Sequence, residues 1–388
     1  MSFFETLPVD LQNSLRAVGS TQEFETGAAI IRSGSVDNTL YVLLCGSLKV
    51  EFSEQVIQLA VGDVVGEMAF LDNRPRTATV RADTNCSLLV LEREPTFQAL
   101  SAQPLLLNAL IEALMDQQHA RLTTEAIKDK RTPIEYVEGL ATQALGHRAV
   151  RHPYLAALSS GELPDVRFAL ADFAQHYYGY SAHFPRYLTA LISRLENPDH
   201  RNALLENLTE EAGEYGQEEL DELCEYGVQP EWIVGIPHPE LFKRFRDALG
   251  VTNTAFADDH IEVVCWRELF ITMLTSGSPA EAVGALGLGT ETIVQSIYEP
   301  FVDAIKHMET LTARDSVFFP LHTAVDDHHQ ATLKAIAAAF ADTPPGRADL
   351  AKGMHKALTL RDSVWNWFYQ RALDPEQARS QEQAKRIL

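Results

Sequence analysis

The sequence predicts a multidomain α+β protein, with an N-terminal antiparallel β-barrel or jelly roll followed by an all-helical bundle. Between residues 21 and 94, short β-rich runs alternate with glycine and Asp/Asn turns, as in small antiparallel barrels. From about residue 134 onward, apolar residues recur at helical spacing and β patterns nearly vanish. A charged stretch that ends in a proline, residues 128–133, separates the two regions. We therefore predict domains at residues 1–130 and 131–388.

Charge and composition exclude several classes of protein. The formal net charge of −22 predicts a surface that repels phosphate backbones and anionic membranes, so we expect no nucleic-acid or membrane partner. No run approaches 18 apolar residues, and the N-terminus has neither the basic nor the apolar part of a signal peptide. The four cysteines are far apart in sequence and form no CxxC pair. We expect a cytoplasmic protein.

The N-terminal elements are predicted as follows. Leu7, Leu11 and Leu15 have helical spacing within residues 3–18. Strands are expected at 29–31, 41–44, 48–52, 56–59, 79–80 and 87–91. A long helix over residues 104–127 carries an apolar stripe, which is compatible with packing on the barrel or with a homodimer.

The segment from Gly62 to Val80 contains a candidate anion site. Gly66 allows a close backbone approach at the start of a short helix, where free N–H groups attract anions. Arg76 offers a planar fork that matches a phosphate, and Glu67 could accept hydrogen bonds from sugar hydroxyls. The alternative is a surface loop whose arginine pairs with an acid of its own chain.

This segment, GEMAFLDNRPRTATV, resembles the phosphate-binding cassette of cyclic nucleotide-binding domains, and the resemblance covers about residues 20–127. It implies that Arg76 meets the cyclic phosphate and Glu67 the ribose 2′-hydroxyl, with Gly66, Ala69 and Thr77 lining the phosphate. It leaves cAMP and cGMP open as ligands. Transcription factors of this family continue into a basic helix-turn-helix, whereas an acidic helical region follows here, so a DNA-binding regulator is the weaker interpretation.

The second region is predicted to be a bundle of seven or eight helices. Their expected ranges are 168–180, 184–195, 202–215, 239–249, 261–275, 290–308, 318–340 and 346–371. On a helix over 318–340, His322, Asp326 and His329 fall on one face at i, i+4 and i+7. Two imidazoles and a carboxylate are a ligand set for a transition metal, iron in particular. A solvated polar face is the alternative.

Three further residues are candidates for the same site. Glu211 falls on the apolar side of its helix, although Glu210 is not excluded by the register. Glu291 heads an apolar line, where an acid that favours the helix dipole is the alternative. His238 stands at a helix start, where it could be a ligand or a cap. With His322, Asp326 and His329 these residues would form a dinuclear site suited to iron or manganese.

Residues 150–340 resemble the heme-oxygenase-like diiron oxidases, relatives in fold of the TENA and PqqC proteins. The specific motifs are HPELF at 238–242 and HxxxDxxH at 322–329. The resemblance implies the same six ligands, two iron ions or a Mn/Fe pair, and dioxygen as co-substrate. Tyr177, Tyr178, Tyr180 and His183 could line the pocket. An acidic stretch over 214–231 is longer than this family's usual connection.

These patterns predict a cyclic nucleotide sensor fused to an iron-dependent, oxygen-activating oxidase or oxygenase with a small organic substrate. The alternative is a non-enzymatic signalling or binding protein whose helical domain holds no metal.

Overall fold

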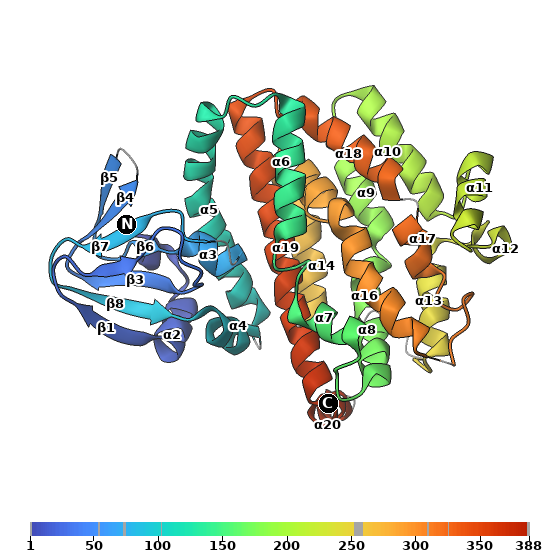
Figure 1. The fold of residues 1–388 in the computed structure, drawn as a ribbon, viewed down its shortest axis with the longest axis horizontal. Coiled ribbons are helices and arrows are strands. Elements are labelled where there is room, and N and C mark those ends of the chain that lie inside the picture. Colours follow the sequence, from blue (N-terminus) through green and yellow to red (C-terminus); the bar gives the residue numbers. More distant parts are fainter. Residues whose placement is uncertain are drawn as a thin grey trace. The chain divides into compact units, whose positions relative to one another are not determined.

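The computed structural model describes residues 2–52, 55–72, 75–101, 103–251, 259–308, 310–324 and 326–385. It divides the chain into two compact units, Met1–Arg121 and Leu122–Leu388 (Figure 1). This division falls within helix α5 (Pro104–Lys128), so the predicted boundary stretch at 128–133 lies inside the second unit. Within the described part, no helix is long and apolar enough to cross a membrane.

The first unit contains two four-stranded antiparallel sheets, which confirms the predicted jelly roll. The strand orders are β1-β8-β3-β6 and β2-β7-β4-β5. The bounds are β1 Ser20–Phe24, β2 Ala29–Ile31, β3 Leu40–Cys45, β4 Leu48–Phe52, β5 Gln55–Leu59, β6 Val64–Val65, β7 Thr79–Ala82 and β8 Cys86–Leu91. Alternate residues such as Leu48, Val50, Val80 and Leu88 point inward and form the core. The helices are α1 Phe3–Thr6, α2 Val9–Val18, α3 Glu67–Asp72 and α4 Arg93–Ser101.

Every regular element described in the second unit is helical, as predicted. Helix α19 (Pro344–Leu373) packs against α8 (Val166–Ser181), α14 (Ile261–Ser276) and the π-helical turn η2 (Gly284–Leu288) (Figure 1). Glycine residues allow the η2 region and α19 to approach each other closely. A Cβ on Gly284 would lie 2.1 Å from the Leu350 carbonyl oxygen, and a Cβ on Gly353 would lie 1.9 Å from that of Glu281.

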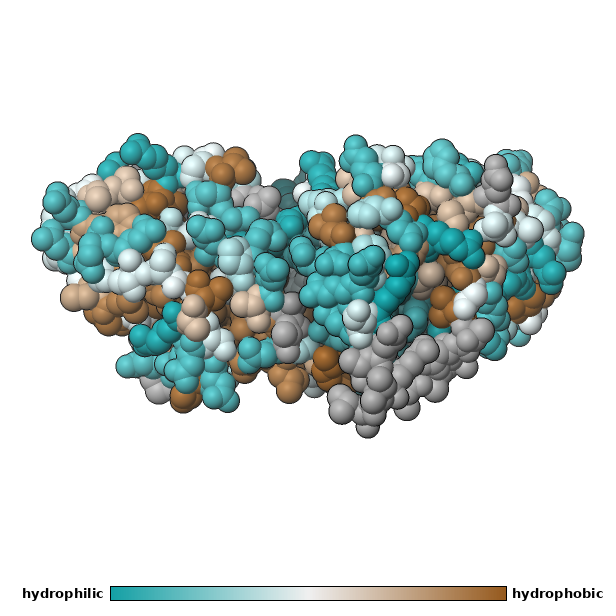
Figure 2. Space-filling model, turned by 90° about the horizontal axis from the view of Figure 1, so that it is seen from below, coloured by the Kyte–Doolittle hydropathy of each residue, from teal (hydrophilic) through white to brown (hydrophobic). Residues whose placement is uncertain are grey.

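The remaining helices include the predicted ones, two of them divided, and several for which no range was predicted. The predicted helix at 290–308 begins as a 3₁₀ turn, η3 (Glu291–Ile293), before α16 (Val294–Lys306), and the predicted helix at 318–340 appears as α17 (Phe318–Ala324) and α18 (Asp326–Phe340). The others are α6 Pro133–Gly146, α7 Pro153–Ser160, α9 Phe184–Ile192, α10 Pro198–Glu211, α11 Gln217–Glu225, α12 Pro230–Ile233, α13 His238–Ala248, α15 Pro279–Val283 and α20 Pro375–Lys385. On the face that Figure 2 shows, hydrophilic residues predominate.

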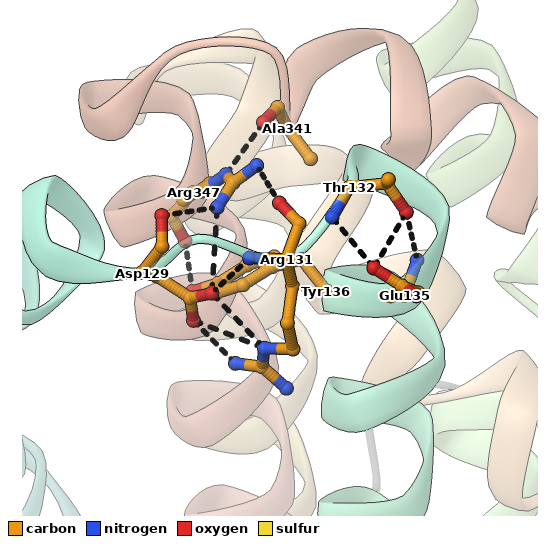
Figure 3. Close-up of polar contacts among 7 residues, drawn as sticks. All are labelled: Asp129, Arg131, Thr132, Glu135, Tyr136, Ala341 and Arg347. Carbon is orange, nitrogen blue, oxygen red and sulfur yellow. Dashed lines mark hydrogen bonds and ion pairs between the residues drawn. The ribbon is translucent and has the colours of Figure 1, made fainter.

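The segment before α6 is held in the helical unit by Arg347 of α19 (Figure 3). The buried Arg347 guanidinium donates hydrogen bonds to the carbonyl oxygens of Ala341 (2.7 Å), Arg131 (2.8 Å) and Asp129 (3.3 Å). Tyr136 donates back to the Arg347 carbonyl at 3.0 Å. Thr132 begins α6 with a capping box to Glu135. These contacts fix the start of the helical unit.

Candidate metal centre

Glu211, His238 and His322 form a close cluster inside the helical unit. Glu211 ends α10, His238 begins α13, and His322 lies on α17. Each offers one ligand atom, and the three atoms lie within 4.8 Å of one another. Glu211 and His238 are buried, and His322 is half-buried. Pro237 precedes His238 and Pro239 follows it. Because proline is favoured in the first turn of a helix, α13 begins at His238. The structure therefore brings together three residues that lie far apart in the sequence.

Hydrogen bonds orient both imidazoles. Nδ1 of His322 lies 2.6 Å from the Phe318 carbonyl oxygen, so it carries the proton and leaves Nε2 as the ligand atom. Nε2 of His238 lies 2.8 Å from the Tyr215 hydroxyl. Its Nδ1 lies 3.0 Å from Oε1 of Glu211 but has no hydrogen-bond partner among the described residues. In the tautomer that carries its proton on Nε2, Nδ1 presents a lone pair beside the carboxylate oxygen, and this arrangement fits a shared cation.

Tyr215 lies outside the cluster and hydrogen-bonds to His238, one of its members. Burial, and then the charges of Glu211, Glu219 and Glu210, raise the pKa of the Tyr215 phenol. The hydroxyl therefore stays protonated, and it can accept a hydrogen bond from Nε2–H of His238. Contacts of this kind orient metal-binding histidines.

The other predicted ligands stand as follows. Glu291 is buried and lines the same pocket, but it lies outside the close cluster. Glu210 also lines the pocket and is half-buried, so the geometry favours Glu211 as the residue beside His238. The side chains of Asp326 and His329 lie outside the described part of the chain.

Aromatic residues form much of the pocket wall. The hydroxyls of Tyr177 and Tyr298 lie 2.9 Å apart, and the Tyr298 ring meets the His322 ring edge-on with centroids 5.7 Å apart. Burial raises the pKa of Tyr298 well above its ordinary value, so this phenol stays neutral. Of the four residues suggested as lining, Tyr177 and Tyr180 line the pocket, whereas Tyr178 and His183 are not part of its lining. The lining also includes Arg361, which the sequence reasoning did not select.

The candidate nucleotide site of the first unit is organised by Gly66 and Arg76. Gly66 has φ +91°, and a Cβ there would lie 2.4 Å from Nη1 of Arg76 and 2.6 Å from the Thr39 carbonyl oxygen. Arg76 is 5 % exposed, and it donates from Nη1 to the Gly66 carbonyl at 3.0 Å and from Nε to Asp37 Oδ1 at 3.0 Å. The pairing with an acid of the same chain, which the sequence left open, is therefore present.

Asp37 remains charged in this pair. Burial would raise the pKa of Asp37, but the hydrogen bond and charge of Arg76 hold it below its usual range. Near this pair, Ala69 is buried, Glu67 is half-buried and Thr77 is exposed.

Family models match both units. Residues 21–103 match the cyclic nucleotide-binding domain, and residues 171–362 match the family described as iron-containing redox enzyme. The chain thus carries a cyclic nucleotide-binding domain followed by a haem-oxygenase-like domain of an iron-containing redox enzyme.

Individual relatives match one domain or the other. A 4-aminobenzoate synthase of Chlamydia muridarum is 24 % identical over 209 residues, which are 53 % of this chain and 79 % of that protein. A cGMP-dependent protein kinase of Toxoplasma gondii is 30 % identical over 121 residues, 30 % of this chain and 12 % of the kinase. A cAMP-dependent protein kinase regulatory subunit of Schizosaccharomyces pombe is 31 % identical over 104 residues, 26 % of this chain and 24 % of the subunit. This chain therefore spans only a small part of either kinase protein.

Proposed function

We propose that the protein is a non-heme, diiron oxidase or oxygenase that acts on a small organic substrate and is regulated by a cyclic nucleotide. The observation that carries this proposal is the close cluster of the buried Glu211 and His238 with the half-buried His322 in the lining of one pocket. The match of residues 171–362 to the iron-containing redox enzymes and the similarity to a 4-aminobenzoate synthase support it.

Glu211, His238 and His322 would hold iron, and Glu291, Asp326 and His329 would complete a set for two metal ions, Fe/Fe or Mn/Fe. Iron bound there would supply the capacity to bind and activate dioxygen. The residues of the chain would orient the metal ligands and limit the access of water to them. The Phe318 carbonyl fixes the tautomer of His322, and Tyr215 orients the ring of His238. Tyr177, Tyr298 and Phe318 give the pocket an aromatic wall that would limit the access of water.

Anaerobic loading with ferrous iron, followed by metal analysis, tests the metal site. We expect about two iron ions per chain in the natural protein and a large loss of iron in His322→Ala. His307→Ala is the matched control, because His307 is an exposed histidine outside the pocket. Oxygen uptake with ascorbate as electron donor should require the bound iron. A folded protein that retains no iron would instead support the non-enzymatic binding module.

Regulation is proposed from the presence of both domains in one chain. Arg76 would bind the cyclic phosphate, and nucleotide binding would favour one state of the enzyme domain. Either cAMP or cGMP could be the ligand, since one kinase relative is named for each. Oxygen uptake should change when either nucleotide is saturating; equal rates, with binding confirmed by calorimetry, would contradict regulation. We also propose a cytoplasmic location, which the four free cysteines support.

A further inference from the structure

Arg361 of α19 is a buried cation that the structure leaves largely unsatisfied. Its exposed fraction is 2 %, and its Nε and Nη1 atoms have no hydrogen-bond partner among the described residues. Nη2 makes a long hydrogen bond of 3.5 Å to the Tyr180 hydroxyl, and the Tyr177 phenol also interacts with the guanidinium. The guanidinium carbon lies 5.3 Å, 5.6 Å and 5.9 Å from the ring centroids of Trp266, Tyr180 and Trp365. Aromatic faces attract the cation, but they accept none of its in-plane N–H groups.

Three other buried arginines of the same unit have charged or carbonyl partners, whereas Arg246, like Arg361, has an Nε and an Nη1 without a hydrogen-bond partner among the described residues. Arg371 donates two hydrogen bonds to Asp172, at 2.8 Å and 2.6 Å. Arg267 pairs with Asp259 at 2.6 Å, and Arg347 donates to three carbonyl oxygens. No described carboxylate forms an ion pair with Arg361. Because an arginine does not lose its proton in a protein, it cannot escape the cost of burial by becoming neutral.

The position of Arg361 indicates what could satisfy it. Arg361 lines the same pocket as Glu211, His238 and His322. Between them lie aromatic side chains: Tyr298 contacts the His322 ring and hydrogen-bonds to Tyr177, whose ring lies 5.9 Å from that of Tyr180. The pocket thus has carboxylate and imidazole ligands in one part, a fixed cation in another, and apolar rings between.

We propose that Arg361 binds the carboxylate of a small organic acid, the substrate of the pocket. The planar guanidinium matches a carboxylate with two parallel hydrogen bonds, and its free Nε and Nη1 atoms are available for them. The apolar body of the acid lies against Tyr177, Tyr180 and Tyr298. That its other end faces the metal ligands rests on the proposed function, whereas carboxylate binding by Arg361 does not.

Binding to the metal-free, full-length protein tests the proposal. Calorimetry with benzoate and hexanoate, each compared with its uncharged amide, measures the contribution of the carboxylate. We expect at least one acid to bind the natural protein at least tenfold more tightly than its amide. This preference should vanish in Arg361→Met and persist in part in Arg361→Lys, which keeps the charge without the fork. Arg246→Met is the matched control, because Arg246 is another buried arginine that stacks on an aromatic ring, outside this lining.

Thermal unfolding separates a binding role from a structural role. Methionine removes an unsatisfied buried charge, so unliganded Arg361→Met should unfold at the same temperature as the natural protein or higher. A substantially lower Tm or a failure to fold would show that Arg361 is already satisfied within the fold, and would overturn the proposal. Equal binding of acid and amide by the natural protein, or an acid preference that survives in Arg361→Met, would do the same.

The titrations contain no iron, so their result is independent of the metal experiment. A protein that loads no iron but prefers acids through Arg361 would contradict the proposed oxidase and support carboxylate binding by Arg361. A protein that loads iron and shows no preference for acids would be consistent with the proposed oxidase and would contradict carboxylate binding by Arg361.

Discussion

Nδ1 of His238 lies 3.0 Å from Oε1 of Glu211, and both side chains are buried at the meeting of α10 and α13. The neighbouring Glu210 lines the same pocket, yet it is more exposed. If the pair holds iron, Glu211→Gln replaces a charged ligand with a poor neutral one. We expect at least a tenfold loss of ferrous iron affinity, measured anaerobically by competition with a chromogenic chelator.

Glu210→Gln is the matched control for that measurement, since it removes the same charge one residue away. Its iron affinity should stay within about threefold of the natural protein, a change of under 1 kcal/mol. A larger loss in Glu210→Gln than in Glu211→Gln would assign the ligand to the other glutamate.

Tyr215→Phe should weaken the same site without removing a ligand. The hydroxyl holds Nε2 of His238 at 2.8 Å and thereby keeps Nδ1 turned toward Glu211. Loss of such an outer contact typically costs about 10- to 100-fold in metal affinity. The chelator competition measures it, with Tyr226→Phe, at an exposed tyrosine, as the control. Unchanged affinity in Tyr215→Phe would mean that the imidazole is oriented by other contacts.

Arg76→Lys should reduce cyclic nucleotide binding at least tenfold. Lysine keeps the charge, but it lacks the fork that now contacts Gly66 and Asp37 together and that would meet a phosphate. Calorimetry with cAMP and with cGMP measures the affinities and also shows which base is preferred. Arg81→Lys is the control, because Arg81 is a half-buried arginine of β7 that pairs with Glu51 at 3.3 Å. Equal affinities of Arg76→Lys and the natural protein would exclude Arg76 as the phosphate ligand.

Local patterns in the sequence predicted much of the fold and part of the site. Alternation and turn residues located six of the eight strands, and β2 and β4 have the predicted bounds. The strand β1, with the polar sequence STQEF, carries no alternation, because four of its five residues are exposed. The two-residue strand β6 is too short to leave a pattern. Helical periodicity placed Glu211 on an apolar side, and the structure buries it.

Contacts between distant residues left little trace in the sequence. Tyr215 meets His238 across 23 residues, and Asp37 meets Arg76 across 39, so no local periodicity links either pair. The sequence does mark Arg361 as unusual, because two charged residues, Arg361 and Asp362, stand between Leu358 and Trp365 on a largely buried helix. The sequence could not show that Nε and Nη1 of Arg361 lack hydrogen-bond partners among the described residues, because its surroundings are side chains from α8 and α14.

A buried charge cluster around His176 predicts how stability depends on pH. Nε2 of His176 lies 3.6 Å from Asp172 of α8 and 3.3 Å from Glu382 of α20. Arg371 of α19 and the rings of His260 and Trp367 also lie beside it. Burial alone would lower the pKa of His176, but the two carboxylates raise it. Burial would raise the pKa values of Asp172 and Glu382, but Arg371 and His176 hold both at about 2.

The sign of each contribution follows from these directions. A raised pKa means that His176 stabilises the fold below about pH 6.5 and that this contribution is lost as pH rises through the folded-state value. The lowered pKa values of Asp172 and Glu382 contribute stability above about pH 4, and this is lost as pH falls toward 2. For the deeply buried Asp172 the loss is about 2 kcal/mol. Urea unfolding at a series of pH values should therefore show greatest stability between about pH 4 and 6.5.

His176→Gln separates the alkaline side of this profile from the acid side. Glutamine keeps a hydrogen-bonding side chain but cannot take up a proton, so the decline above about pH 6.5 should become shallower. The free energy of unfolding should fall most at pH 5, where His176 is charged, and this difference should shrink as pH rises through the raised folded-state pKa of His176. His307→Gln, at an exposed histidine, should leave the profile unchanged. A constant difference between His176→Gln and the natural protein from pH 5 to 9 would show that His176 does not change its protonation on unfolding.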